Sequence, residues 1–131
     1  MPRTVDAALA NRSALYYSPV EEVRIPSWSR DRVVLIGDAA HATAPVWAQG
    51  AALAAEDALV LADLLDELND WSVIGDEFER HRRPRVQHVQ AMTDKLSHAA
   101  RLPNWQRDGL LPIIGPRTYR QTYRPLRDPV L

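Results

Sequence analysis

The sequence predicts an α/β fold that is dominated by helices, with a small sheet of two or three strands. Two long segments, residues 50–68 and 75–101, carry apolar residues at helical spacing. The run RVVLI at residues 32–36 precedes them and shows no alternation of apolar and polar residues. Such a run favours burial on both faces, as in an interior strand of a sheet covered by helices.

The elements before this strand are short. Residues 2–11 favour a short helix capped by Thr4. The runs ALYYS at 14–18 and VEEVRI at 20–25 predict two strands. PSWSRD, at 26–31, is a polar turn that contains a tryptophan.

In the first predicted long helix, one acidic residue lies away from the face that carries the others. Its acidic residues Glu56, Asp63, Asp66 and Glu67 lie on one stripe, whereas Asp57 lies off that stripe. We therefore expect Asp57 to face protein and to need a hydrogen-bond partner, either backbone or an arginine. The other residues are Ala, Leu and Val, so we expect most of the circumference to be buried.

The second long helix and the tail differ in their proline content. Pro84 is predicted to kink the helix at 75–101 or to begin its main segment. From Leu102 onward five prolines predict only short helices and turns that wrap over another surface. The predicted buried seam of the helix comprises Val86, Val89, Met92, Leu96 and Ala99.

Composition excludes several classes of function. The chain has 131 residues, about the length of a single domain. Its net charge of −1 favours binding neither to nucleic acid nor to an anionic membrane surface. No apolar run approaches the roughly 20 residues that a membrane helix needs. The absence of cysteine excludes disulfides, thiolate chemistry and Cys-based zinc sites, and it fits a reducing cytoplasm.

The loop after RVVLI has the chemistry of a ligand site. Ligands bind at the carboxyl ends of strands in open α/β sheets, and Asp38 is the first polar residue after this strand. Its carboxylate can accept hydrogen bonds from sugar hydroxyls. The helix that begins near Gly50 presents free N–H groups and a positive dipole end. This combination suits an anionic or polyhydroxyl ligand.

Residues 32–65, RVVLIGDAAHATAPVWAQGAALAAEDALVLADLL, resemble the second FAD-binding signature of the flavin-dependent aromatic hydroxylases. These are the class A monooxygenases with the p-hydroxybenzoate hydroxylase fold, and their pattern is GDAAH, Pro, GQG and N-x-A-x-E-D-A. FERHRRPRVQHVQ, at 78–90, resembles the family's next helix, so the resemblance spans about residues 20–98. The matching positions are Gly37, Asp38, Ala39, Ala40, His41, Pro45, Gln49, Gly50, Ala54, Glu56, Asp57 and Ala58.

The resemblance implies the C-terminal part of an FAD-dependent monooxygenase that uses NAD(P)H and O2 to hydroxylate a small aromatic substrate. It assigns Asp38 to the ribityl chain of FAD, Pro45 to the side of the isoalloxazine ring, and the backbone amides of residues 49–51 to the pyrimidine edge. It assigns no catalytic side chain and no metal ligand. The cofactor-binding positions that it implies are Gly37, Asp38, Pro45, Gln49, Gly50 and Ala51.

Two positions depart from the family pattern. Ala48 replaces the first glycine of GQG, and Ala52 replaces the asparagine. We expect the Ala48 methyl group to hinder close approach of the flavin ring, and the asparagine's hydrogen bonds are lost. In addition, the five glycines cannot form the G-x-G-x-x-G fingerprint that holds the pyrophosphate.

The sequence therefore predicts a single unit that forms one wall of a cofactor cleft. Residues 1–28 would be a remnant of substrate-domain strands, 29–101 the second FAD-binding motif with its long helices, and 102–131 a Pro-rich C-terminal wrap. We expect no activity from this unit alone, and completion by self-association or by a separate N-terminal chain. A truncated gene product and a proteolytic fragment are alternatives. A non-catalytic remnant or interaction subunit is the other reading of its function.

Three further features have plainer readings. His41 lies three residues after Asp38, but no third ligand is near, and the resemblance makes this histidine structural. The basic cluster at 80–85 is read as a solvated helix face with local ion pairs, not as a nucleic-acid patch. Trp47 either contacts flavin or substrate, or covers the apolar underside of the loop.

Overall fold

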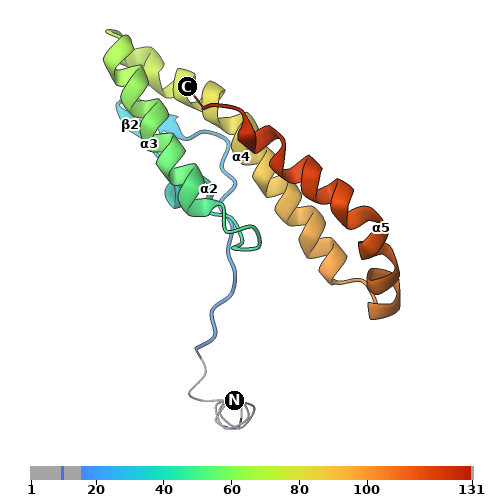
Figure 1. Cartoon of the computed structure of the whole chain (residues 1–131). Coiled ribbons are helices and arrows are strands. Elements are labelled where there is room, and N and C mark those ends of the chain that lie inside the picture. The colour runs from blue at the N-terminus through green and yellow to red at the C-terminus, as the bar shows by residue number, and fades with distance from the viewer. Residues whose placement is uncertain (1–9, 11–15, 131) are drawn as a thin grey trace.

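The computed structural model describes residue 10 and residues 16–130, and it is built mainly from helices (Figure 1). The long helices are α3 (Gly50–Glu67), α4 (Trp71–Ala100) and α5 (Asn104–Tyr123). The short elements are β1 (Ser29–Arg30), β2 (Val33–Val34), α2 (Asp38–His41) and η2 (Pro125–Arg127). The predicted fold class, helix-dominated with a small sheet, is confirmed. The predicted helix at 2–11 lies, apart from residue 10, outside the described residues.

Helix α4 is the element against which the others pack. Helix α3 runs antiparallel along its first half, and α5 runs back along its second half (Figure 1). The core lies between α3, residues 74–89 of α4 and residues 28–40. Within residue 10 and residues 16–130, no helix combines the length and apolar character needed to cross a membrane. The core residues are Trp28, Ala40, Leu53, Val60, Leu64, Ile74, Phe78, Val86 and Val89.

Helix α3 confirms the predicted bounds but not the predicted burial. Its buried residues, Leu53, Asp57, Val60 and Leu64, recur every three or four positions and form one face toward α4. The expectation that most of the circumference is buried is wrong, because Leu59 is 57% exposed. In the part of the chain that the structure describes, α4 covers only one side of this helix.

Helix α4 begins at Trp71 because Asp70 caps it, its side chain accepting a hydrogen bond of 2.9 Å from the Ser72 N–H. The helix continues across Pro84, whose ring lies on the exposed side. The predicted seam is buried at Val86, Val89 and Met92 and half-buried at Leu96 and Ala99.

The prediction of short elements after Leu102 is wrong, because α5 is a single helix with Pro112 and Pro116 inside it. Each proline removes the hydrogen bond to the carbonyl four residues earlier, on Asp108 and Pro112. Both of those residues are exposed, so water can hydrate the freed carbonyl groups. Two prolines on an exposed side therefore do not end this helix.

The sheet is smaller than the sequence predicts. Only Val33 and Val34 of the run at 32–36 form a strand, and they pair antiparallel with Arg30 and Ser29. Because no other described residue pairs with β2, the run is not an interior strand, and Val33 is 62% exposed. Residues 16–25 form no strand either, so the strands predicted at 14–18 and 20–25 are wrong there; residues 14 and 15 lie outside the described ranges.

Glu79 of α4 anchors the start of the hairpin. Its Oε1 accepts hydrogen bonds from the Trp28 N–H at 2.5 Å, the Ser29 N–H at 3.0 Å and the Ser27 hydroxyl at 2.8 Å. Its other oxygen pairs with Arg83, whose guanidinium lies 4.5 Å over the Trp28 ring. Burial acts to raise the pKa of Glu79, but the hydrogen bonds from Arg83, Ser27 and Trp28 outweigh it and lower the pKa to about 2.

Gly75 should be required where α4 crosses β1. A Cβ at this position would stand 2.5 Å from the Ser29 Cβ. We expect Gly75→Ala to lower the free energy of unfolding by about 1–3 kcal/mol through this overlap, measured by urea denaturation. Gly109→Ala is the matched control, because nothing lies within 4 Å of a Cβ there, and alanine should stabilise α5 by up to about 1 kcal/mol. Equal effects of the two changes would contradict the close packing.

The Glu79 contacts should make stability depend on pH in the acid range. The lowered pKa means that the contribution of Glu79 is complete above its ordinary value of 4.5 and is lost as the pH falls toward about 2. The free energy of unfolding, measured between pH 6 and pH 2, should therefore fall more steeply in the wild type than in Glu79→Gln. Parallel curves would show that the Glu79 carboxylate is not stabilised in the folded state.

Candidate functional site

The candidate site lies where β2, α2 and the start of α3 meet. Gly37, directly before α2, has a φ of +58°, in the left-handed region that favours glycine. A Cβ at this position would also stand 3.1 Å from the Ala54 Cβ. Conformation and space therefore both call for glycine, and its small size lets the turn lie close against α3.

A buried carboxylate holds this turn. Asp57 of α3 is fully buried, and its Oδ2 accepts hydrogen bonds from the Gly37 N–H at 2.9 Å and from His41 Nε2 at 2.6 Å. Its Oδ1 accepts one from Arg82 Nε at 2.7 Å. The prediction that Asp57 faces protein and finds a backbone or arginine partner is confirmed, and both kinds of partner are present.

The charges continue outward from Asp57 in alternating sign. Arg82, also fully buried, donates to Glu56 at 2.8 Å, and Glu56 accepts from Arg85 at 2.6 Å. We call His41, Glu56, Asp57, Arg82 and Arg85 the buried charge cluster. The reading of residues 80–85 as a solvated face is therefore wrong for Arg82. The inward Asp57 was the signal that could have found it, since a buried carboxylate needs a cation.

Burial acts to raise the pKa of Asp57, but its hydrogen bonds outweigh that effect. The donors from His41, Arg82 and the Gly37 backbone together lower the pKa of this carboxyl below its usual range. Asp57 is therefore ionised at neutral pH and acts only as an acceptor. It joins α3 to the strand end, to α2 and to α4 through one side chain.

Asp38 and Gly50 are brought together. Asp38 is the first residue of α2, is exposed, and has its Oδ1 3.8 Å from the place where a Cβ on Gly50 would stand. At the start of α3 the first backbone bond runs from the Leu53 N–H to the Gln49 carbonyl. The N–H groups of residues 50–52 thus have no partner within the helix. A carboxylate acceptor and a set of N–H donors therefore share one small region.

The loop before α3 carries the other predicted positions. Pro45 is exposed, and Gln49 stands directly before α3 without a side-chain cap bond. Ala48, where the family pattern has glycine, has a φ of +53°, in the left-handed region. Pro45 also lines a separate hollow with Ser97 and other residues of α4.

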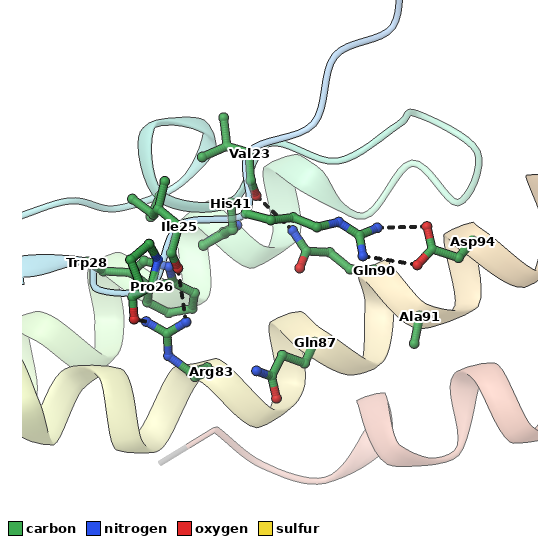
Figure 2. Close-up of a pocket in the computed structure, with 12 residues that line it drawn as sticks. Val23, Ile25, Pro26, Trp28, His41, Arg83, Gln87, Gln90, Ala91 and Asp94 are labelled. Atoms are coloured by element: carbon green, nitrogen blue, oxygen red, sulfur yellow. Dashed lines mark hydrogen bonds and ion pairs between the residues drawn. The ribbon is translucent and has the colours of Figure 1, made fainter.

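A different pocket, of about 530 Å³, lies between residues 23–28 and α4 (Figure 2). Arg24 donates two hydrogen bonds, of 2.7 and 3.0 Å, to the carboxylate of Asp94, which is labelled in Figure 2. Gln90 donates to the Val23 carbonyl at 3.0 Å. None of the six predicted cofactor-binding residues lines this pocket. The hydrogen bonds between its walls attach residues 23 and 24 to α4.

Removing the buried carboxylate charge should cost more stability than removing an exposed one. Asp57→Asn leaves the Arg82 charge buried with a weaker partner, and we expect the free energy of unfolding to fall by about 3–5 kcal/mol. The exposed Asp63 of the same helix is the control, and Asp63→Asn should change it by less than about 0.5 kcal/mol. Urea denaturation followed by circular dichroism measures both. Similar values would mean that the buried charge cluster does not fix the turn.

Several known proteins are similar in sequence to part of this chain. A 2-heptyl-3-hydroxy-4(1H)-quinolone synthase of Pseudomonas aeruginosa is 39% identical over 84 residues, which is 63% of this chain and 21% of the relative. A 6-hydroxynicotinate 3-monooxygenase of Bordetella bronchiseptica is 40% identical over 76 residues, 56% of this chain and 20% of the relative. The 3-amino-4-hydroxybenzoate 2-monooxygenase PtnB3 of Streptomyces platensis is 40% identical over 87 residues, which is 66% of this chain and 22% of the relative.

The chain thus spans about a fifth of the length of these relatives. The family model described as FAD binding domain matches residues 5–93, which include β2, the turn, α3 and most of α4. The resemblance found from the sequence motif is confirmed. Because this match covers well over half of the residues and the whole strand–loop–helix unit, the chain belongs to the FAD binding domain family.

Proposed function

We propose that this chain holds the ribityl chain and the pyrimidine edge of FAD in a monooxygenase that hydroxylates a small aromatic substrate with NAD(P)H and O2. The observation that carries the proposal is the position of the Asp38 carboxylate beside Gly50, at the free N–H groups that begin α3. Family membership supports the same assignment.

The groups present fit FAD. The hydroxyls of the ribityl chain need an acceptor, which the exposed Asp38 carboxylate provides. The pyrimidine edge carries negative charge when the ring is reduced, and it needs N–H donors. The resemblance assigns residues 49–51 to it, and the N–H groups of Gly50 and Ala51 are free at the start of α3. Glycine at position 50 leaves the space beside Asp38 open, although a Cβ there would stand 3.8 Å from Asp38 Oδ1, an ordinary contact distance.

FAD, when bound, supplies the redox chemistry that passes electrons from a nicotinamide cofactor to O2. The residues of this chain bind and orient it. Asp38 fixes the ribityl chain, and the positive end of α3 stabilises negative charge on the ring without reorganising. Pro45 restricts the loop beside the ring through its fixed φ.

The remaining walls of the cleft lie outside these 131 residues in this proposal. The five glycines form no pyrophosphate fingerprint, and a second copy of this chain would bring the same five, so the pyrophosphate site would come from another region of polypeptide or a separate chain. The exposure of Leu59 and Leu65 on α3 and of Val33 on β2 supports an additional covering surface. The cysteine-free sequence supports a cytoplasmic location.

The alternative is a non-catalytic unit that keeps the fold and acts through protein contacts. The observation that favours it is the departure from the family pattern at two positions, where Ala48 replaces a glycine and Ala52 replaces an asparagine. Gel filtration with added FAD tests the proposal. Flavin absorbance that travels with the protein supports the enzyme part, whereas flavin left wholly in the small-molecule fraction would overturn FAD binding by this chain alone and would leave a remnant or a fragment that needs the rest of the cleft.

Asp38→Ala should weaken FAD binding by roughly 10–100-fold, the value of one hydrogen bond to a charged group. Equilibrium dialysis of FAD against wild type and variant measures the dissociation constants. Asp66→Ala, on the exposed end of α3 distant in sequence from the loop, is the matched control and should bind like the wild type. Equal affinity of the Asp38 and Asp66 variants would remove Asp38 from the cofactor site.

A further inference from the structure

The C-terminal helix touches the loop that precedes α3. The ring of Tyr123, the last residue of α5, meets Trp47 edge to face, with centroids 5.8 Å apart and planes at 87°. Tyr119, one turn earlier, lies against Tyr123 at 4.6 Å. Such aromatic pairs are attractive beyond the area that they bury. An element that begins far beyond the family's motif thus reaches the middle of it.

The position of Tyr123 is fixed from both sides. Its neighbour Thr122 is the one buried residue of α5, and the Thr122 carbonyl accepts a hydrogen bond of 2.9 Å from His88 Nε2. After the helix, Arg85 donates to the carbonyls of Pro125, Leu126 and Asp128, at 2.8–3.2 Å. Arg85 belongs to the buried charge cluster, so the end of α5 is attached to the same network that holds Gly37.

The loop itself has little to hold its shape. Its internal backbone bonds are one from the Val46 N–H to the Ala44 carbonyl at 2.8 Å and a longer one, of 3.4 Å, from the Ala48 N–H to the Pro45 carbonyl. Ala48 is in the left-handed region, which is unfavourable for a residue with a Cβ. The loop therefore needs contacts from outside to stay in this conformation.

We propose that Tyr123 is a positioning residue for the loop at 45–49: it packs on Trp47 and so holds Pro45 and Gln49 in place. The role in cofactor binding rests on the proposed function, since it takes this loop to be the one that lies along FAD. The contact itself is a property of the protein without cofactor. Tyr123 touches neither FAD nor substrate in this assignment, and it acts through Trp47.

Hydrogen exchange of the loop amides in the FAD-free protein tests the contact. Tyr123→Ala should speed exchange at residues 46–49 by about 3- to 10-fold, the factor that corresponds to loss of one aromatic pair. Tyr123→Phe keeps the ring and should exchange like the wild type. The control is Ile113→Ala, on the exposed side of α5, which should leave the loop unchanged.

A double-mutant cycle shows whether the effect passes through Trp47. In a Trp47→Ala background, Tyr123→Ala should add nothing to loop exchange, whereas independent effects would overturn the proposal. Exchange in α3 and α4 should stay at the wild-type rate. A general acceleration across both helices would assign Tyr123 a merely structural role and would equally overturn it.

FAD dialysis separates this proposal from the proposed function. If Tyr123→Ala raises the dissociation constant of FAD and Tyr123→Phe restores it, the positioning role is supported. If wild-type and Tyr123→Ala chains bind FAD equally, the positioning role is overturned while the proposed function stands. If the wild type binds no FAD, the proposed function fails for this chain and the role in cofactor binding fails with it.

Discussion

The carboxylate of Asp57 is the point at which the parts of the site are joined. It belongs to α3, and it accepts hydrogen bonds from the turn at Gly37, from His41 of α2 and from Arg82 of α4. A buried charge is tolerated only when every partner is in place, so these partners have little freedom to move. Their fixed position places Asp38 against the start of α3, because Asp38 follows directly after Gly37.

The order of charges extends this constraint to the end of the chain. Asp57 compensates Arg82, and Arg82 and Arg85 share Glu56. Arg85 also donates to the carbonyls of Pro125, Leu126 and Asp128. The tail is thus fixed relative to the turn by hydrogen bonds from Arg85 to its carbonyls and by the packing of Leu126 and Val130 against the core. This explains how α5, which buries only Thr122, still has a defined place beside α4.

Local signals made part of this structure predictable, and tertiary context decided the rest. The period of α3 placed its ends almost correctly and showed that Asp57 points inward, because both follow from the helix itself. The burial of Arg82 depends on the packing of α4 against α3, so the run of basic residues at 80–85 alone predicts the wrong exposure for it. Pro112 and Pro116 predict breaks, yet α5 continues across both and leaves the freed carbonyls of Asp108 and Pro112 to water. The contact between Trp47 and Tyr123 joins segments far apart in the sequence, and no local sequence pattern predicts it.

Ala48 bears on the choice between an enzyme part and a remnant. A glycine would adopt this left-handed conformation at no steric cost, whereas alanine there costs about 1–2 kcal/mol. Ala48 nevertheless adopts it, and the loop is held from two sides, by Glu22 through the Ala44 N–H at 3.2 Å and by Tyr123 through Trp47. Contacts that maintain an unfavourable conformation beside Asp38 and the free N–H groups of α3 favour a loop still shaped for a ligand.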